Sequence, residues 1–95
     1  MDIDGVNEAG KAIHEVLETY TYGCRNDEAL TKVNSLADGA LKLSDNDPYV
    51  SEKVASIKSF AAILYSVRKH ERYGGAEKVR SIIFSDAYRL RTWDA

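Results

Sequence analysis

Cysteine, proline and long apolar stretches are scarce in this chain of 95 residues, which has one cysteine and one proline. The single cysteine, Cys24, has no second thiol with which to form an internal disulfide or a cysteine zinc site. The longest clean apolar run, residues 60–65, falls far short of the roughly 20 residues that span a membrane. The acidic first residues lack the basic and apolar segments of a secretory signal. These absences predict a cytoplasmic chain, and its length is that of a single domain, residues 1–95.

A large excess of one charge is also missing, because the formal net charge at pH 7 is −2 and the pI is about 5.6. That balance argues against a generic nucleic-acid coat. The total hides two unlike halves: residues 1–52 hold 11 acidic and 4 basic side chains, and residues 53–95 hold 4 acidic and 9 basic ones. Either the two halves attract each other within the fold, or the basic half faces an acidic partner.

Apolar side chains recur every three or four residues in four segments, which predicts four amphipathic helices. The expected helices cover residues 5–22, 27–43, 48–72 and 76–93. Asp47-Pro48 is typical of a helix start, whereas Gly23 and Gly74-Gly75 are typical of helix ends. Short connections make successive helices antiparallel, so we expect an all-α, up-down four-helix bundle. The third helix should be the longest and should project from one end.

The candidate reactive residues fit simpler structural roles. His14 and Glu18 are four residues apart, but a metalloprotease helix needs two histidines at this spacing. His70 belongs to a charged helix end. Cys24 lies beside Arg25 and just ahead of the second helix, but this arrangement is common and a nucleophilic cysteine also needs a base. Residues 45–47 lack the central glycine and the closing glutamate of a calcium loop. We therefore expect no catalytic residue, no metal site and no cofactor, and we expect that the protein is not an enzyme.

One flank of the expected last helix carries Arg80, Phe84, Tyr88 and Arg91 at helical spacing. Tyrosine and arginine are enriched at binding hot spots, so this flank is the predicted partner-binding surface. The alternative is that the two rings pack under a neighbouring helix or the C-terminal tail.

Arg68 and Tyr73 complete the predicted partner-binding set. Arg68 continues the inward stripe of the third helix, so it either lies beyond the core or pairs with an acidic residue of the first two helices. Tyr73 lies in the basic half, where tyrosines could stack bases while lysines and arginines contact phosphates.

Several segments taken together resemble the immunity proteins for pediocin-like bacteriocins. The likeness covers residues 26–90 and is carried by residues 26–33, 41–43, 47–48 and 60–65 with Val54 and Ile57. It implies a cytosolic four-helix bundle that protects a producer cell without catalysis. The implied partner is a bacteriocin with its membrane receptor, a sugar phosphotransferase permease, at the inner face. The acidic first half departs from the lysine-rich composition of that family.

Together these patterns predict a non-catalytic helical bundle, monomeric or homodimeric, that recognises a protein partner. The alternative is a small phage or plasmid regulator that contacts nucleic acid or a nucleic-acid enzyme.

Overall fold

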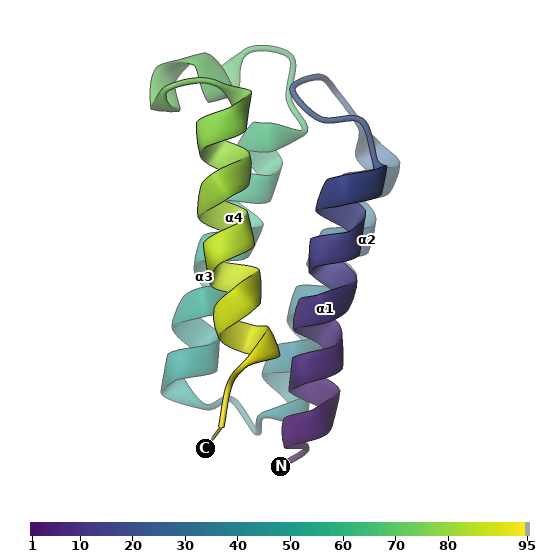
Figure 1. The fold of residues 1–95 in the computed structure, drawn as a ribbon, viewed down its shortest axis with the longest axis vertical. Helices are drawn as coiled ribbons and strands as arrows, with labels where there is room; N and C mark the ends of the chain where they lie inside the picture. The colour runs from purple at the N-terminus through teal and green to yellow at the C-terminus, as the bar shows by residue number, and fades with distance from the viewer. Residues whose placement is uncertain (95) are drawn as a thin grey trace.

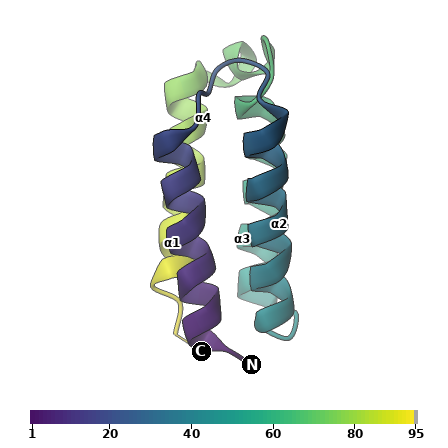
Figure 2. The same ribbon diagram turned by 90° about the vertical axis from the view of Figure 1, so that its right-hand side faces the viewer.

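The computed structural model describes residues 1–94, which form four α-helices and one short 3₁₀ helix (Figure 1). The elements are α1 (Ile3–Thr19), α2 (Asp27–Leu43), α3 (Pro48–Leu64), η1 (Lys69–Tyr73) and α4 (Ala76–Arg91). Successive helices run in opposite directions, so α1 begins and α4 ends at the same end of the bundle (Figure 2). The all-α four-helix bundle expected from the sequence is confirmed. No helix within residues 1–94 combines the length and the apolar character needed to cross a membrane.

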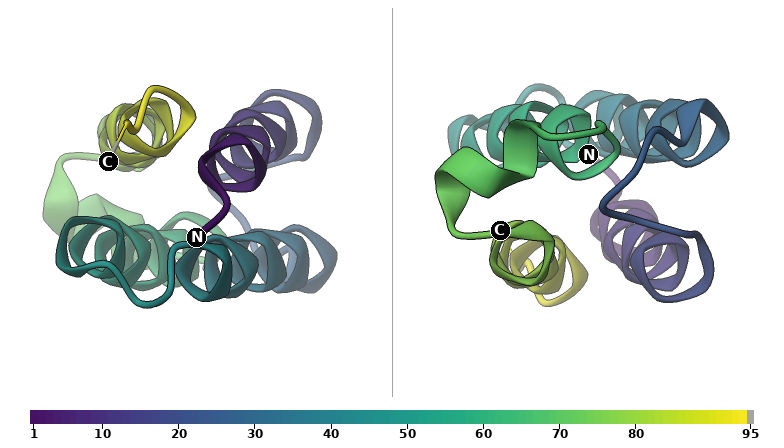
Figure 3. Two further views of the ribbon diagram at one scale, coloured as in Figure 1. Left: turned by 90° about the horizontal axis from the view of Figure 1, so that it is seen from below. Right: turned by 90° about the horizontal axis from the view of Figure 1, so that it is seen from above.

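The four helices form a ring when the bundle is seen along its axis (Figure 3). α1 packs against α2 and α4, and α3 packs against the same two helices. The centre of the ring is filled by the apolar stripes that the sequence spacing predicts. The large side chains that are fully buried there are Val6, Ile13, Leu17, Val33, Val50, Ile57, Leu64, Val79, Ile83 and Leu90.

Side-chain caps begin the first three helices. Asp2 accepts a hydrogen bond from the Gly5 backbone N–H at 2.8 Å, so α1 begins two residues earlier than expected. Asn26 caps α2 through the Ala29 N–H at 3.1 Å. Asp47 accepts hydrogen bonds from two backbone N–H groups at the start of α3, directly before Pro48.

The expectation of a longer third helix is wrong, because α3 ends at Leu64 and has the same 17 residues as α1 and α2. The Ser66 hydroxyl donates a hydrogen bond to the Ile63 carbonyl at 2.5 Å and accepts one from the Lys69 N–H at 3.1 Å. The Leu64 carbonyl accepts the Gly23 N–H at 3.0 Å. An α-helix that continued past Leu64 would need the Ile63 and Leu64 carbonyls for its own backbone hydrogen bonds. Because other groups occupy these carbonyls, residues 65–68 form a turn and the next helical segment is η1.

α1 and α4 approach each other closely at Gly10. A Cβ atom at this position would lie 2.5 Å from the Arg91 backbone nitrogen and 2.7 Å from the Ala87 carbonyl oxygen. One turn earlier, the Asn7 side chain donates hydrogen bonds to the carbonyls of Leu90 at 2.8 Å and Trp93 at 3.0 Å. The Leu90 carbonyl lies in the last turn of α4, where it also accepts the Trp93 N–H at 3.2 Å, and the Trp93 carbonyl lies just beyond the helix.

We predict that Gly10→Ala destabilises the protein by about 1–3 kcal/mol, because the added methyl group meets backbone atoms that cannot rotate away. Gly39→Ala is the matched control, since nothing lies within 4 Å of its added Cβ. This second change should stabilise α2 by about 0.5–1 kcal/mol. Urea unfolding of the two variants measures both effects, and equal stability of Gly10→Ala and the wild type would contradict the prediction.

Candidate protein-binding surface

The six residues predicted to bind a partner fall into two groups. Arg80, Phe84, Tyr88 and Arg91 follow one side of α4, and the first two contact α1. Arg68 and Tyr73 lie instead in the connection between α3 and α4. The structure therefore does not bring the six into one continuous patch.

Arg80 is held inside the seam between α1 and α4. Its Nε donates a hydrogen bond to the Leu17 carbonyl at 3.0 Å, near the end of α1. Its guanidinium carbon lies 4.6 Å from the Tyr22 ring centroid and 4.5 Å from that of Phe84. The last turn of α1 has no basic residue of its own, so Arg80 places a positive charge there from another helix.

Phe84 takes part in the same seam. Its ring is half-buried, and its centroid lies 4.5 Å from that of the His14 ring on α1. His14 in turn lies 3.3 Å from the Glu18 carboxylate, so these two residues form an ion pair within one helix when the imidazole is protonated. No group of three or more metal-ligating side chains gathers anywhere in the part of the chain that the structure describes.

Tyr88 and Arg91 are the exposed members of the α4 group. The Tyr88 side chain is 59% exposed, and Arg91 is also exposed. Within residues 1–94 neither side chain makes a hydrogen bond or an ion pair. They lie about one helical turn apart on a helix whose other side is fixed to α1.

Arg68 and Tyr73 mark a second, separate surface at the end of the bundle. Arg68 lies beyond the core, with an 80% exposed side chain whose Nε is 3.6 Å from a Glu71 carboxylate oxygen. It does not pair with an acidic residue of α1 or α2. Tyr73 is 47% exposed and packs edge-on against Phe60 of α3, with 5.9 Å between ring centroids. Arg68, Lys69, Glu71 and Arg72 line an open hollow of about 500 Å³ in the connection between α3 and α4.

The acidic and basic halves of the chain occupy opposite sides of the ring. α1 and α2 are neighbours on one side, and α3 and α4 are neighbours on the other (Figure 3). Among residues 1–94, a single ion pair joins the α1–α2 side to the α3–α4 side, between Lys58 Nζ and Asp38 Oδ1 at 2.8 Å; the Lys53–Glu52 pair lies within α3. Most charged side chains therefore do not pair between the two sides of the bundle and remain exposed to solvent.

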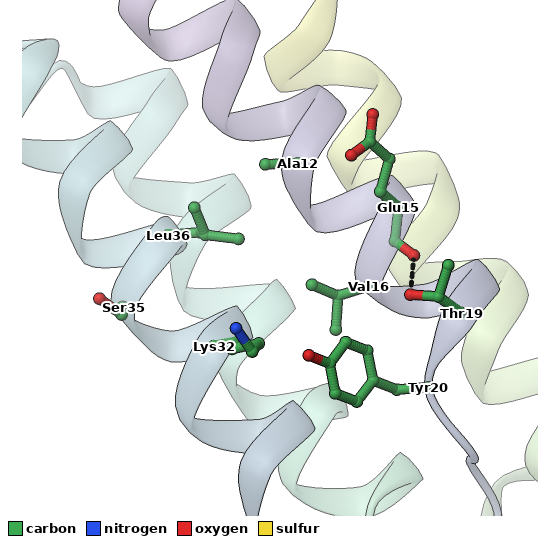
Figure 4. A pocket seen from close by; sticks show the side chains of 8 residues that line it. All are labelled: Ala12, Glu15, Val16, Thr19, Tyr20, Lys32, Ser35 and Leu36. Carbon is green, nitrogen blue, oxygen red and sulfur yellow. Dashed lines mark hydrogen bonds between the residues drawn. The ribbon is translucent and has the colours of Figure 1, made fainter.

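Sequence analysis missed two sets of residues. His14, Leu17 and Tyr22 form the α1 side of the seam, and only the packing of α1 on α4 reveals them. A surface groove between α1 and α2 was also missed (Figure 4). The sequence holds one signal for this groove, because small residues such as Ala12 and Gly39 occur on both helices.

Comparison with protein-family models, curated proteins and solved structures found no match. The function is therefore inferred from the geometry of α4, on which Arg80 and Phe84 are held against α1 whereas Tyr88 and Arg91 are exposed.

We predict that Arg80→Ala and Phe84→Ala each lower the free energy of unfolding by about 2 kcal/mol, because each removes a contact between α1 and α4. Tyr88→Ala and Arg91→Ala are the matched controls, and each should change it by less than about 0.5 kcal/mol. Chemical denaturation of the four variants separates the two classes. A large loss in the Tyr88 variant would show that its ring belongs to the core.

Tyr65, near the end of α3, gives a pH-dependent prediction. Its side chain is 3% exposed, its hydroxyl has no hydrogen-bond partner within residues 1–94, and burial raises its pKa from 10.0 to about 12. Folding thus favours the neutral phenol, and this contribution to stability is present below pH 10 and is lost as the pH rises through about 12. Between pH 10 and about 12, the free energy of unfolding of Tyr65→Phe should therefore fall less than that of the wild type.

At pH 7 the same variant should be about 1 kcal/mol more stable, because it removes a buried hydroxyl that lacks a partner. Tyr88→Phe is the control, because the Tyr88 ring is exposed. Loss of this exposed hydroxyl should change neither the stability at pH 7 nor its dependence on pH. Urea unfolding at several pH values is the measurement. Identical pH profiles for Tyr65→Phe and the wild type would contradict the assignment.

Proposed function

We propose that the protein is a non-catalytic binding module that recognises a protein partner through α4, with Tyr88 and Arg91 as its exposed anchors. The observation that carries the proposal is the exposure of these two side chains without a hydrogen bond or ion pair within residues 1–94. Tyrosine and arginine contribute large, specific contacts at interface centres. Both anchors are free to make such contacts.

The side of α4 that packs against α1 supports this role, because its contacts hold the helix in place before a partner binds. Arg80 joins the first half of the helix to the end of α1, and Asn7 of α1 binds the carbonyl of Leu90 near its last residue. A partner that binds Tyr88 and Arg91 therefore meets a rigid helix. Little backbone entropy is lost on binding to such a surface, which favours affinity.

The specific form of the proposal is a cytoplasmic immunity protein against a pediocin-like bacteriocin. The partner is then the complex of bacteriocin and membrane receptor at the inner face of the membrane. The resemblance over residues 26–90 and the four-helix architecture support this form. The basic half, residues 53–95, carries both α4 anchors, and in that family the C-terminal half selects the bacteriocin.

Expression of the chain in a bacterium that is sensitive to a pediocin-like bacteriocin tests this proposal. We predict that the wild-type chain protects the cells, as measured by the bacteriocin concentration that inhibits growth. The double variant Tyr88→Ala/Arg91→Ala should lower that concentration at least about tenfold, which corresponds to a modest hot-spot loss of about 1.4 kcal/mol. Thr31→Ala/Lys42→Ala, an exposed pair on α2, is the matched control and should protect fully.

Absence of protection against a panel of such bacteriocins would overturn the immunity form of the proposal. Titration with DNA at several salt concentrations tests the alternative, a regulator that contacts nucleic acid. The surface that favours this alternative is the hollow lined by three basic residues, Arg68, Lys69 and Arg72, and one acidic residue, Glu71. Tight DNA binding with a steep salt dependence that is lost in Arg68→Ala/Arg72→Ala would replace the protein-binding proposal.

A further inference from the structure

A groove runs between α1 and α2 on the outer surface of the bundle. It consists of two adjoining hollows of about 430 Å³ and 400 Å³ that share Ala12, Ser35 and Leu36. Only residues of α1 and α2, with Tyr20 directly after α1, line the two hollows. The groove therefore lies on the outer side of these two helices, and the buried side chains of Ala9 and Val16 form part of its floor.

The floor of the groove is apolar. The surface is hollow there because several of the lining side chains are small. Gly5, Ala9 and Ala12 on α1 face Gly39 on α2, with Leu36 also exposed to the groove. The lining residues of α1 extend from Gly5 to Thr19, which is about 21 Å at the helical rise of ~1.5 Å per residue. That length fits about four turns of a docked helix, and amphipathic helices bind such grooves through apolar residues three or four apart.

The α1 wall of the groove is acidic. Glu8 and Glu15 lie along its outer edge two turns apart, with the Glu15 carboxylate on the side of α1 away from α2 (Figure 4), and neither carboxylate has an ion-pair partner within residues 1–94. The basic residue on the opposite wall, Lys32, lies over the Tyr20 ring at 5.9 Å from its centroid (Figure 4). An occupant therefore meets an apolar floor and two free negative charges along one edge.

Charge argues against a second copy of this chain as the occupant. α1 carries four acidic residues and one lysine, so a symmetric contact between two grooves would place one acidic wall against another. The basic helix α4 of a second copy does not fit either. Its apolar residues Val79, Ile83 and Leu90 are fully buried in its own core and are not free to fill the floor.

We propose that the α1–α2 groove binds an amphipathic helix of a partner protein, one whose apolar face is bordered by basic residues two turns apart. The apolar face covers the groove floor, and the two basic side chains pair with Glu8 and Glu15. This surface lies across the bundle from the α3–α4 side and does not depend on Tyr88 or Arg91.

The test uses the full chain and two synthetic amphipathic peptides of about 18 residues, long enough for the groove. Both carry the same leucines, and one has lysines whereas the other has glutamates at the two edge positions. We predict that the lysine peptide shifts backbone amide resonances of α1 and α2 along the groove. The glutamate peptide should bind at least about tenfold more weakly, because it places like charges beside the acidic wall.

Glu8→Lys/Glu15→Lys should weaken binding of the lysine peptide about tenfold, as measured by fluorescence anisotropy. Glu52→Lys/Glu71→Lys is the matched control, since it makes the same change in net charge on exposed residues outside the groove. This control should change the affinity less than about twofold, and so should Tyr88→Ala/Arg91→Ala. Circular dichroism should show that all three variants remain helical.

Three results would overturn the proposal. The first is equal binding of the two peptides, or equal weakening by the groove variant and the charge control. The second is a set of resonance shifts confined to α3 and α4. The third is concentration-dependent self-association of the chain that shifts the groove resonances without any peptide, which would make a second copy the occupant.

Discussion

The contact between α1 and α4 closes the bundle, and the other features of the molecule depend on it. These are the first and last helices, so their contact must overcome the loop entropy of nearly the whole chain. Three features offset that cost: the backbone approach at Gly10, the bonds from Asn7 to the end of α4, and the bond from Arg80 to the end of α1. Each helix thus supplies side chains that satisfy carbonyls at the C-terminal end of the other.

Hydrogen bonds between connections at the far end of the bundle extend this closure. The Gly23 N–H binds the Leu64 carbonyl, and the Gly23 carbonyl accepts a hydrogen bond from His70 Nε2 at 3.1 Å. The Tyr22 hydroxyl also donates a hydrogen bond to Glu77, and this bond raises the pKa of the tyrosine. The loop after α1 is therefore joined to both ends of the α3–α4 connection. These bonds explain why α3 stops early and why α4 begins directly beside α1.

A closed ring with acidic α1 and α2 and basic α3 and α4 presents two chemically different sides. Because only Lys58 and Asp38 form an ion pair between the α1–α2 side and the α3–α4 side within residues 1–94, each side keeps most of its charge exposed to solvent. The two proposed surfaces follow from this arrangement. The α4 surface offers an aromatic ring and a cation on a rigid helix, whereas the α1–α2 groove offers an apolar floor beside two carboxylates. The two proposals thus assign partners of different chemistry to opposite sides of the bundle.

The sequence by itself determined the number of α-helices, the residues of their buried faces and the cap at Asp47, because these depend on spacing and on bonds between near neighbours. It left two interpretations of Phe84 open and did not reveal that the Arg80 guanidinium is held between Tyr22 and Phe84. It also predicted a third helix that continued through residues 65–72. Only the tertiary structure decided these points, since Leu64, Phe84 and Arg80 all have partners that are distant in the chain. A long side chain or a free carbonyl binds whatever the packing places beside it, and helical periodicity does not record which element that is.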